Sequence, residues 1–93
     1  MAEREFEWDQ RKAEANLAKH KVSFEVAKEA FDDRFAVDWF EGYDNGDERF
    51  NLVGFVANRL LFVAYTIRNS TTRIISARPA TRHEKRIYHE DQA

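Results

Sequence analysis

The run from Leu60 to Ile67 constrains the fold most, because it is apolar at both odd and even positions apart from Thr66. A half-exposed strand alternates between apolar and polar side chains, whereas a strand with both faces covered is almost continuously apolar. The run is also far shorter than the ~20 apolar residues of a membrane-spanning helix. It therefore predicts a central β-strand that is covered on both faces.

Segments on either side of this run have features typical of β-strands and hairpins. Phe35, Val37 and Trp39 are spaced two residues apart, and Asn45-Gly46 is the strongest turn signal in the chain. A four-residue loop, 69–72, is expected before the last strand. The predicted strands are 35–40, 49–56, 60–67 and 73–78. Together they predict a four-stranded antiparallel meander.

Helical signals precede the strands. After a short extended segment at 6–8, Asp9 is a suitable N-cap for a helix over residues 10–20. Ser23 is a suitable N-cap for a second helix that runs to about Phe31. Phe24, Ala27 and Phe31 fall at helical spacing, so we expect them on its buried face.

A further helix follows the strands. Thr81 and Glu84 have the spacing of a capping box, which predicts a helix that runs to about His89. The predicted fold is therefore α+β, with two N-terminal helices, the meander and a C-terminal helix. A chain of 93 residues has the length of one domain, 1–93.

The charge of the chain is strongly segregated. Residues 1–58 contain 8 Lys and Arg against 14 Asp and Glu, whereas residues 59–89 contain 7 Lys and Arg against Glu84 alone. This pattern predicts one surface for a polyanion and another for a basic partner. That both halves are ordinary solvated surface stays open as the alternative.

Composition excludes several classes of site. The chain has no Cys, so it has neither disulfides nor thiolate metal ligands. Its three His, at 20, 83 and 89, lack the i, i+4 spacing of a helical zinc site, and we expect no metal. The first twelve residues are charged throughout and lack the apolar region of a signal peptide, so we expect a cytoplasmic protein.

Short motifs follow one another in a fixed order along the chain. The N-terminal part contains Phe6-Glu7-Trp8-Asp9, Lys12, Asn16, Lys19-His20, Val22-Ser23-Phe24 and Phe31-Asp32-Asp33. The C-terminal part contains Glu48-Arg49-Phe50, Tyr65-Thr66, Arg68, the run 73–78, Ala80, Glu84, Arg86 and Tyr88. This ordered set resembles the BrnT-type toxins. Lys21 departs from the family, which usually has Gly there, and Arg34 stands where Pro is common.

The resemblance implies a RelE-like fold and an endoribonuclease that uses no metal or other cofactor and arrests growth by destroying RNA. It also implies a cognate antitoxin of the ribbon-helix-helix type in a hetero-oligomer, through which the complex contacts operator DNA. The alternative is a non-catalytic nucleic-acid- or protein-binding module that acts in transcriptional regulation.

Metal-free cleavage of RNA requires a base, an acid and cations that stabilise the phosphorane. Arginine suits the last role, because its planar guanidinium binds two phosphate oxygens at once. Arg68 and Arg73 flank the predicted four-residue loop and are expected to lie nearly opposite each other, with a phosphate between them. The alternative is that both extend into water.

A second group of candidates lies about 17 Å from Arg73 along the last strand. Arg78 is a catalytic candidate, and Arg82 begins the last helix. An RNA strand that lies along the sheet would reach both groups. Glu84 is either a catalytic carboxylate or only the capping-box acid. The residues expected to bind RNA without a catalytic role are Arg49, Arg73, Arg82 and Arg86.

The first helix supplies the remaining catalytic candidates. Lys12, Asn16 and His20 are four residues apart and form one polar stripe. Lys12 is the candidate for charge stabilisation. His20 is the candidate acid or base, because its unperturbed pKa lies near neutrality. The alternative for His20 is an interaction with the helix dipole.

The antitoxin has two candidate surfaces. It is expected to cover part of the basic face, or else the acidic N-terminal half meets a basic segment of the partner. Trp39, Phe40 and Tyr43 are candidates for an exposed aromatic patch in such an interface.

Overall fold

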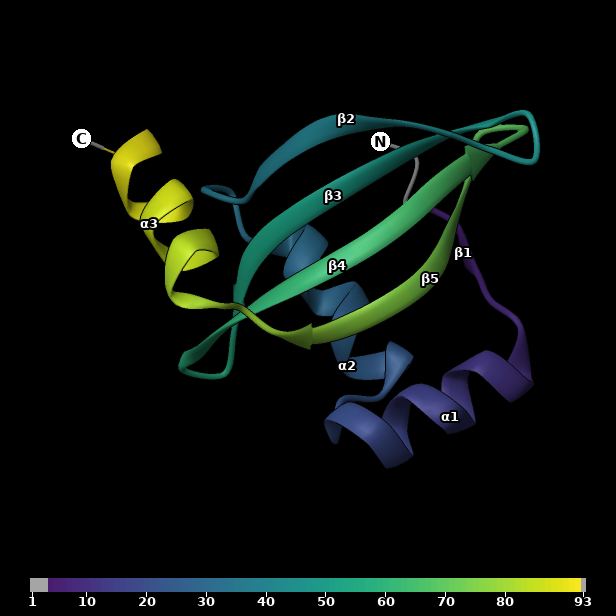
Figure 1. Ribbon diagram of the computed structural model, residues 1–93, viewed down its shortest axis with the longest axis horizontal. Helices are drawn as coiled ribbons and strands as arrows, with labels where there is room; N and C mark the ends of the chain where they lie inside the picture. Colours follow the sequence, from purple (N-terminus) through teal and green to yellow (C-terminus); the bar gives the residue numbers. More distant parts are fainter. Residues whose placement is uncertain (1–3, 93) are drawn as a thin grey trace.

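The computed structural model describes residues 4–92, so residues 1–3 and 93 of the predicted domain lie outside the described range. Figure 1 shows three helices around one sheet. In chain order the elements are β1 (Phe6–Glu7), α1 (Gln10–His20), α2 (Phe24–Ala27), the 3-10 helix η1 (Lys28–Asp32), β2 (Val37–Asp44), β3 (Asp47–Val56), β4 (Arg59–Arg68), β5 (Thr71–Pro79) and α3 (Arg82–Asp91).

The sheet has five strands in the order β1-β5-β4-β3-β2. Strands β2 to β5 pair antiparallel, whereas β1 pairs parallel with β5, where Phe6 is opposite Thr72 and Glu7 is opposite Arg73. The α+β class is confirmed, but the predicted four-stranded antiparallel arrangement is wrong because the sheet is mixed and five-stranded. A strand of two residues is too short for alternation to mark it in the sequence.

The strands are longer than predicted, because each hairpin turn has only two residues. Both turn residues have positive φ in all three hairpins, as type I′ turns require. Strand β2 therefore extends to Asp44 instead of ending at Phe40. The predicted loop 69–72 is also wrong, since Thr71 and Thr72 already belong to β5. The turns are Asn45-Gly46, Ala57-Asn58 and Asn69-Ser70.

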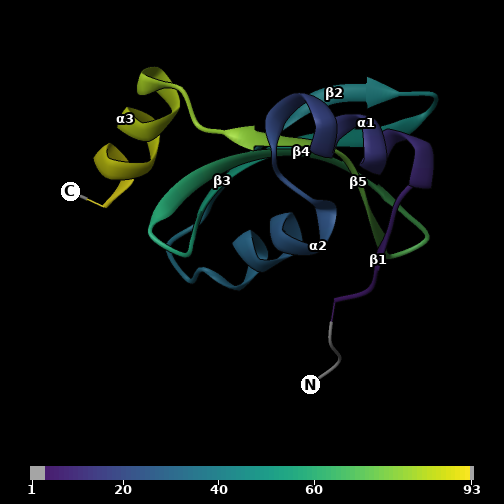
Figure 2. The same cartoon turned by 90° about the horizontal axis from the view of Figure 1, so that it is seen from below.

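One face of the sheet packs against α2 and η1, as Figure 2 shows. The predicted single helix to Phe31 is wrong, because the α-helix ends at Ala27 and a 3-10 helix continues to Asp32. The buried face predicted for this segment is confirmed: Phe24 and Ala27 are fully buried, and Phe31 packs against the same core. Burial of such apolar surface is the main favourable contribution to folding.

The other face of the sheet is covered by α3 only at one end. Tyr88 packs there with Val53 and Leu60. Its hydroxyl donates a hydrogen bond of 2.8 Å to Asp33. Burial and this hydrogen bond raise the pKa of Tyr88 to about 12, so the phenol remains a donor at neutral pH. Since β4 is packed on both sides, the prediction of a doubly covered central strand is confirmed.

Candidate functional site

Four cations gather on the sheet face that carries α3, at the end away from that helix. Arg49 and Arg73 lie on either side of Thr66 in one row across β3, β4 and β5. Arg68 is two residues beyond Thr66 and therefore points to the same face. Lys12 of α1 lines the same cavity as Arg68 and Arg73. We call Lys12, Arg49, Arg68 and Arg73 the arginine cluster.

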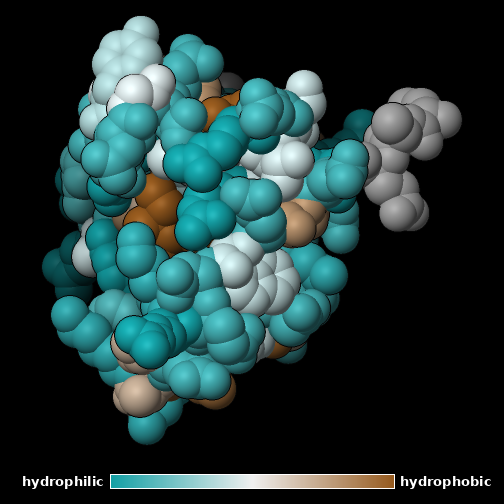
Figure 3. Space-filling view, turned by 90° about the vertical axis from the view of Figure 1, so that its right-hand side faces the viewer, coloured by the Kyte–Doolittle hydropathy of each residue, from teal (hydrophilic) through white to brown (hydrophobic). Residues whose placement is uncertain are grey.

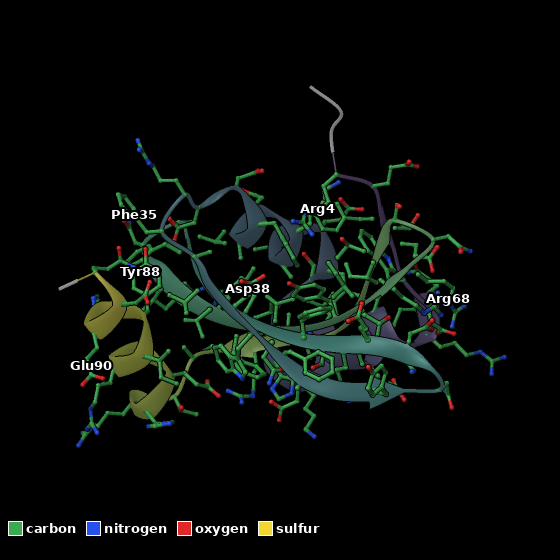
Figure 4. The ribbon with its side chains drawn as sticks, turned by 90° about the horizontal axis from the view of Figure 1, so that it is seen from above. Arg4, Phe35, Asp38, Arg68, Tyr88 and Glu90 are labelled. Carbon is green, nitrogen blue, oxygen red and sulfur yellow. The ribbon has the colours of Figure 1, made fainter. Side chains whose placement is uncertain are left out.

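A cavity of about 130 Å³ is lined by three members of this cluster, Lys12, Arg68 and Arg73. Figure 4 shows Arg68 at one end of the sheet and Tyr88 at the other, so the cavity is remote from α3. In Figure 3 this end of the molecule is mainly hydrophilic, with only small hydrophobic patches. The residues that line the cavity are Lys12, Asp44, Asn45, Asp47, Thr66, Arg68, Arg73 and Ile75.

Arg68 and Arg73, expected to lie nearly opposite each other, are diagonal neighbours on one face. Arg68 is opposite Thr71, and Arg73 is opposite Thr66. This offset reduces their repulsion relative to a direct pair. The offset follows from the turn, which has two residues where four were expected.

Two arginines of the cluster are paired with carboxylates. Both Nε and Nη2 of Arg68 donate to one oxygen of Asp47, at 3.0 and 2.8 Å. Arg73 donates to Glu7 of β1 at 2.9 Å. The hydrogen bonds to Asp47 raise the pKa of Arg68, so its guanidinium stays charged. Both pairs are partly exposed, and ion pairs of this kind contribute little net stability.

Arg49 differs from its neighbours in the cluster. Its Nε is buried, and it is the one buried side-chain nitrogen or oxygen in residues 4–92 that has no hydrogen-bond partner. A buried donor on a charged group is costly when it is left unpaired. Arg49 also makes no ion pair with another described residue.

Helix α1 is fixed against β5 by Asn16. The buried Asn16 amide donates to the Ala77 carbonyl at 2.7 Å and to the Val22 carbonyl at 2.9 Å, and its oxygen accepts the Ala77 N–H at 3.1 Å. Asn16 is therefore an anchor and does not belong with Lys12 and His20 as a free polar group. The anchor places Lys12 one turn before the contact and His20 one turn after it.

His20 lies beside the arginine cluster, on an adjoining hollow of about 240 Å³. Lys12 and Ile75 line both this hollow and the cavity of the cluster, so the two are contiguous. Ser76 of β5 also lines this hollow. Lys21 ends the helix in the left-handed conformation, with φ 61°, which is the strained position expected for a residue that replaces Gly.

Arg78 and Glu84 form a separate pair farther along β5. The guanidinium of Arg78 donates to both carboxylate oxygens of Glu84 at 2.8 Å and lies 4.3 Å from the centre of the Phe62 ring. Glu84 also accepts from the Thr81 N–H, so the predicted capping box is confirmed. Burial opposes ionisation of Glu84, but the hydrogen bonds from Arg78 and Thr81 outweigh it and lower its pKa.

The sequence candidates therefore fall into three sets. Lys12, His20, Arg49, Arg68 and Arg73 lie on contiguous surface. Arg78 is two residues beyond Ser76 on the same strand, about 7 Å farther on, and Glu84 holds it. Arg82 and Arg86 lie exposed on α3, and their side chains make no hydrogen bond or ion pair with another described residue. Sequence reasoning missed Glu7, Asp47, Thr66 and Ser76.

The contacts of the missed residues depend on how the strands pair. Asp47 reaches Arg68 because the β2–β3 turn is tight, and Glu7 reaches Arg73 because β1 joins the sheet. Thr66 could have been noticed in the sequence, because it is the one polar residue in the apolar run 60–67.

Within residues 4–92, no three His, Asp or Glu side chains are grouped closely enough to hold a metal ion. None of the helices described is both long and apolar enough to cross a membrane.

Guanidinium groups gathered on one sheet face have the chemistry that suits a phosphate-bearing ligand. Residues 8–84 match the family described as the ribonuclease toxin BrnT of type II toxin–antitoxin systems. Because the match spans most of the chain, the protein belongs to the BrnT family. It is a ribonuclease toxin, and an antitoxin is its partner. No curated protein matches the chain closely enough to count as a relative.

Proposed function

We propose that the chain cleaves RNA internally on the surface formed by the arginine cluster and His20, using its own side chains without a metal ion. The observation that carries this proposal is the convergence of Lys12, Arg49, Arg68 and Arg73 around Thr66 on one sheet face. Such a group of cations is suited to the charge that develops on a phosphorane.

In this proposal, phosphate groups of the RNA replace the carboxylates of the chain as partners of the arginines. A phosphate takes the place of Asp47 on Arg68 and of Glu7 on Arg73, each with the bidentate geometry that guanidinium groups favour. Arg49, beside Thr66 in the same row, contributes its positive charge to this face. Lys12 contributes a further positive charge from α1.

His20 is assigned to proton transfer. The 2′-oxygen attacks the adjacent phosphorus, its proton passes to a base, and the bond to the 5′-oxygen breaks as that oxygen receives a proton from an acid. The products are a 2′,3′-cyclic phosphate and a 5′-hydroxyl end. His20 is assigned to one of these two transfers because it is the imidazole on the hollow beside the cluster, and imidazole is a common general acid or base.

Arg78 is assigned to a neighbouring phosphate of the same strand, and Glu84 positions it. The lowered pKa of Glu84 makes it a poor base, so we assign it no proton transfer. The exposed Arg82 and Arg86 add further positive charge along α3 for the same RNA strand. For the partner, we propose a DNA-binding antitoxin of the ribbon-helix-helix type that carries the complex to operator DNA.

The test is cleavage of a mixed RNA in EDTA by the purified chain, with the new ends analysed chemically. The double variant Arg68→Ala/Arg73→Ala is compared with Arg59→Ala, an exposed arginine at the other end of β4. We expect cyclic phosphate ends from the wild type and from Arg59→Ala, and at least a hundredfold loss of rate in the double variant. Equal rates in all three proteins would contradict the proposal.

A further inference from the structure

A second charged surface lies on the free edge of the sheet, at strand β2. The strand order leaves β2 without a neighbour on its outer side. Phe40 is 50% exposed and Tyr43 is 72% exposed, which is unusual for such large side chains. Glu41 lies between them, and Glu48 is opposite Tyr43 on β3. We call Phe40, Glu41, Tyr43 and Glu48 the acidic aromatic edge.

The charge of this edge is not balanced within the chain. The β2–β3 hairpin carries Asp38, Glu41, Asp44, Asp47 and Glu48 against Arg49 alone. Asp47 is already paired with Arg68, and Asp38 accepts the Tyr65 hydroxyl at 2.8 Å. Glu41 and Glu48 make no ion pair with any residue of the described range.

The exposed rings are held in place by the core. Phe40 meets Tyr43 and Phe50 edge-on, with ring centres 5.4 and 5.7 Å apart, and Phe50 stacks on the buried Tyr65. The rings are therefore ordered before any partner arrives. Such preorganisation lowers the entropic cost of binding.

We propose that the acidic aromatic edge binds an extended basic segment of the antitoxin. The segment adds a strand to β2 through main-chain hydrogen bonds, while its Lys or Arg side chains reach Glu41 and Glu48 and pack over the Tyr43 ring. This inference rests on the chain being a toxin with an antitoxin, and it is independent of which residues cleave RNA.

Charge selects this occupant over the others that an open strand edge attracts. A second copy of the chain would bring the same carboxylates to the same edge, and like charges on facing strands repel. RNA is repelled for the same reason. A segment with alternating basic and apolar side chains satisfies both the carboxylates and the rings.

The experiment is a calorimetric titration of the purified antitoxin into the full-length chain. The variant Glu41→Lys/Glu48→Lys is compared with Glu14→Lys/Glu90→Lys, which makes the same change in net charge at exposed positions on α1 and α3. We expect the dissociation constant to rise at least tenfold in the first variant and to stay within twofold of wild type in the second.

Tyr43→Ala should raise the dissociation constant at least fivefold with an unchanged melting temperature. Hydrogen exchange at β2 should slow in the complex.

Equal dissociation constants in both charge variants, or unchanged exchange at β2 in the complex, would overturn the inference. Self-association of Glu41→Lys/Glu48→Lys with intact antitoxin affinity would also overturn it, because the carboxylates would then serve only to keep copies apart. Cleavage of RNA is measured separately. Failure of the arginine variants to lose activity would end the proposed cleavage site and leave these affinities unchanged.

Discussion

The arginine cluster and the acidic aromatic edge lie on the same sheet but differ in how their charges are paired. On the basic face, Arg68 and Arg73 each have a carboxylate of the chain as partner. On the edge, Glu41 and Glu48 have no cation among the described residues. Under the two proposals, the difference teaches that RNA would have to displace internal anions, whereas a basic partner would meet carboxylates without an internal cation.

The largest expected effect concerns the histidine beside the cluster. His20→Gln should lower the rate of RNA cleavage by about 10²–10⁴-fold, because general acid–base groups contribute that much. Affinity for the antitoxin should stay unchanged, which separates the two surfaces. The matched control is His83→Gln on the exposed side of α3. A similar loss of rate in both variants would argue against His20 as the proton-transfer group.

Loss of the Asn16 side chain, which anchors α1, should have the next largest effect. Asn16→Ala removes three hydrogen bonds in a buried site and leaves main-chain groups of Val22 and Ala77 unpaired. We expect the free energy of unfolding to fall by about 2–4 kcal/mol, measured by urea denaturation. Gln10→Ala, at an exposed position of the same helix, should change it by less than about 0.5 kcal/mol. Equal effects would mean that Asn16 does not hold α1.

The Arg78–Glu84 pair predicts a smaller, pH-dependent effect. The pKa of Glu84 in the folded chain lies below its ordinary value of 4.5, so ionised Glu84 stabilises the fold above pH 4.5. This contribution is lost as the pH falls through the lowered pKa. Glu84→Gln should therefore lower the free energy of unfolding by about 1–2 kcal/mol at neutral pH. The difference from wild type should shrink in acid.

The control for this prediction is Glu90→Gln, at an exposed position of α3. The free energy of unfolding of this variant should match that of the wild type at every pH. A stability difference for Glu84→Gln that persists unchanged well below pH 4 would show that the carboxylate contributes through its shape and not through its charge.

The smallest effect sharpens the comparison between the two surfaces. Asp47→Asn removes the carboxylate that holds Arg68 and should tighten RNA binding by about two- to fivefold, because an exposed ion pair is weak. Binding is measured with a non-cleavable 2′-O-methyl RNA, and Asp32→Asn is the control. Weaker binding by Asp47→Asn would mean that the carboxylate orients Arg68 and does not compete with phosphate.

Local patterns predicted those parts of the fold that depend on a few neighbouring residues. The caps at Asp9, Ser23 and Thr81 are present, and β4 is central. The parts that depend on distant residues were not predictable in this way. A two-residue β1 gains its role only from β5, and the switch to a 3-10 helix after Ala27 has no strong local signal.

The candidate site shows the same division. The residue types were found from the sequence, because arginine and histidine have recognisable chemistry. Their partners were not, because Asp47 and Glu7 meet Arg68 and Arg73 only once the hairpin register and β1 are set. Asn16 was placed with the polar stripe of α1, since nothing in its spacing showed that it faces Ala77.

The most direct test observes the arginines themselves. In nuclear magnetic resonance spectra of the chain, the Nε–Hε signals of arginine side chains are followed while 2′-O-methyl RNA is added. We expect the signals of Arg49, Arg68 and Arg73 to shift and that of Arg59 to stay in place. Shifts confined to arginines outside the cluster, at a concentration that saturates binding, would contradict the account.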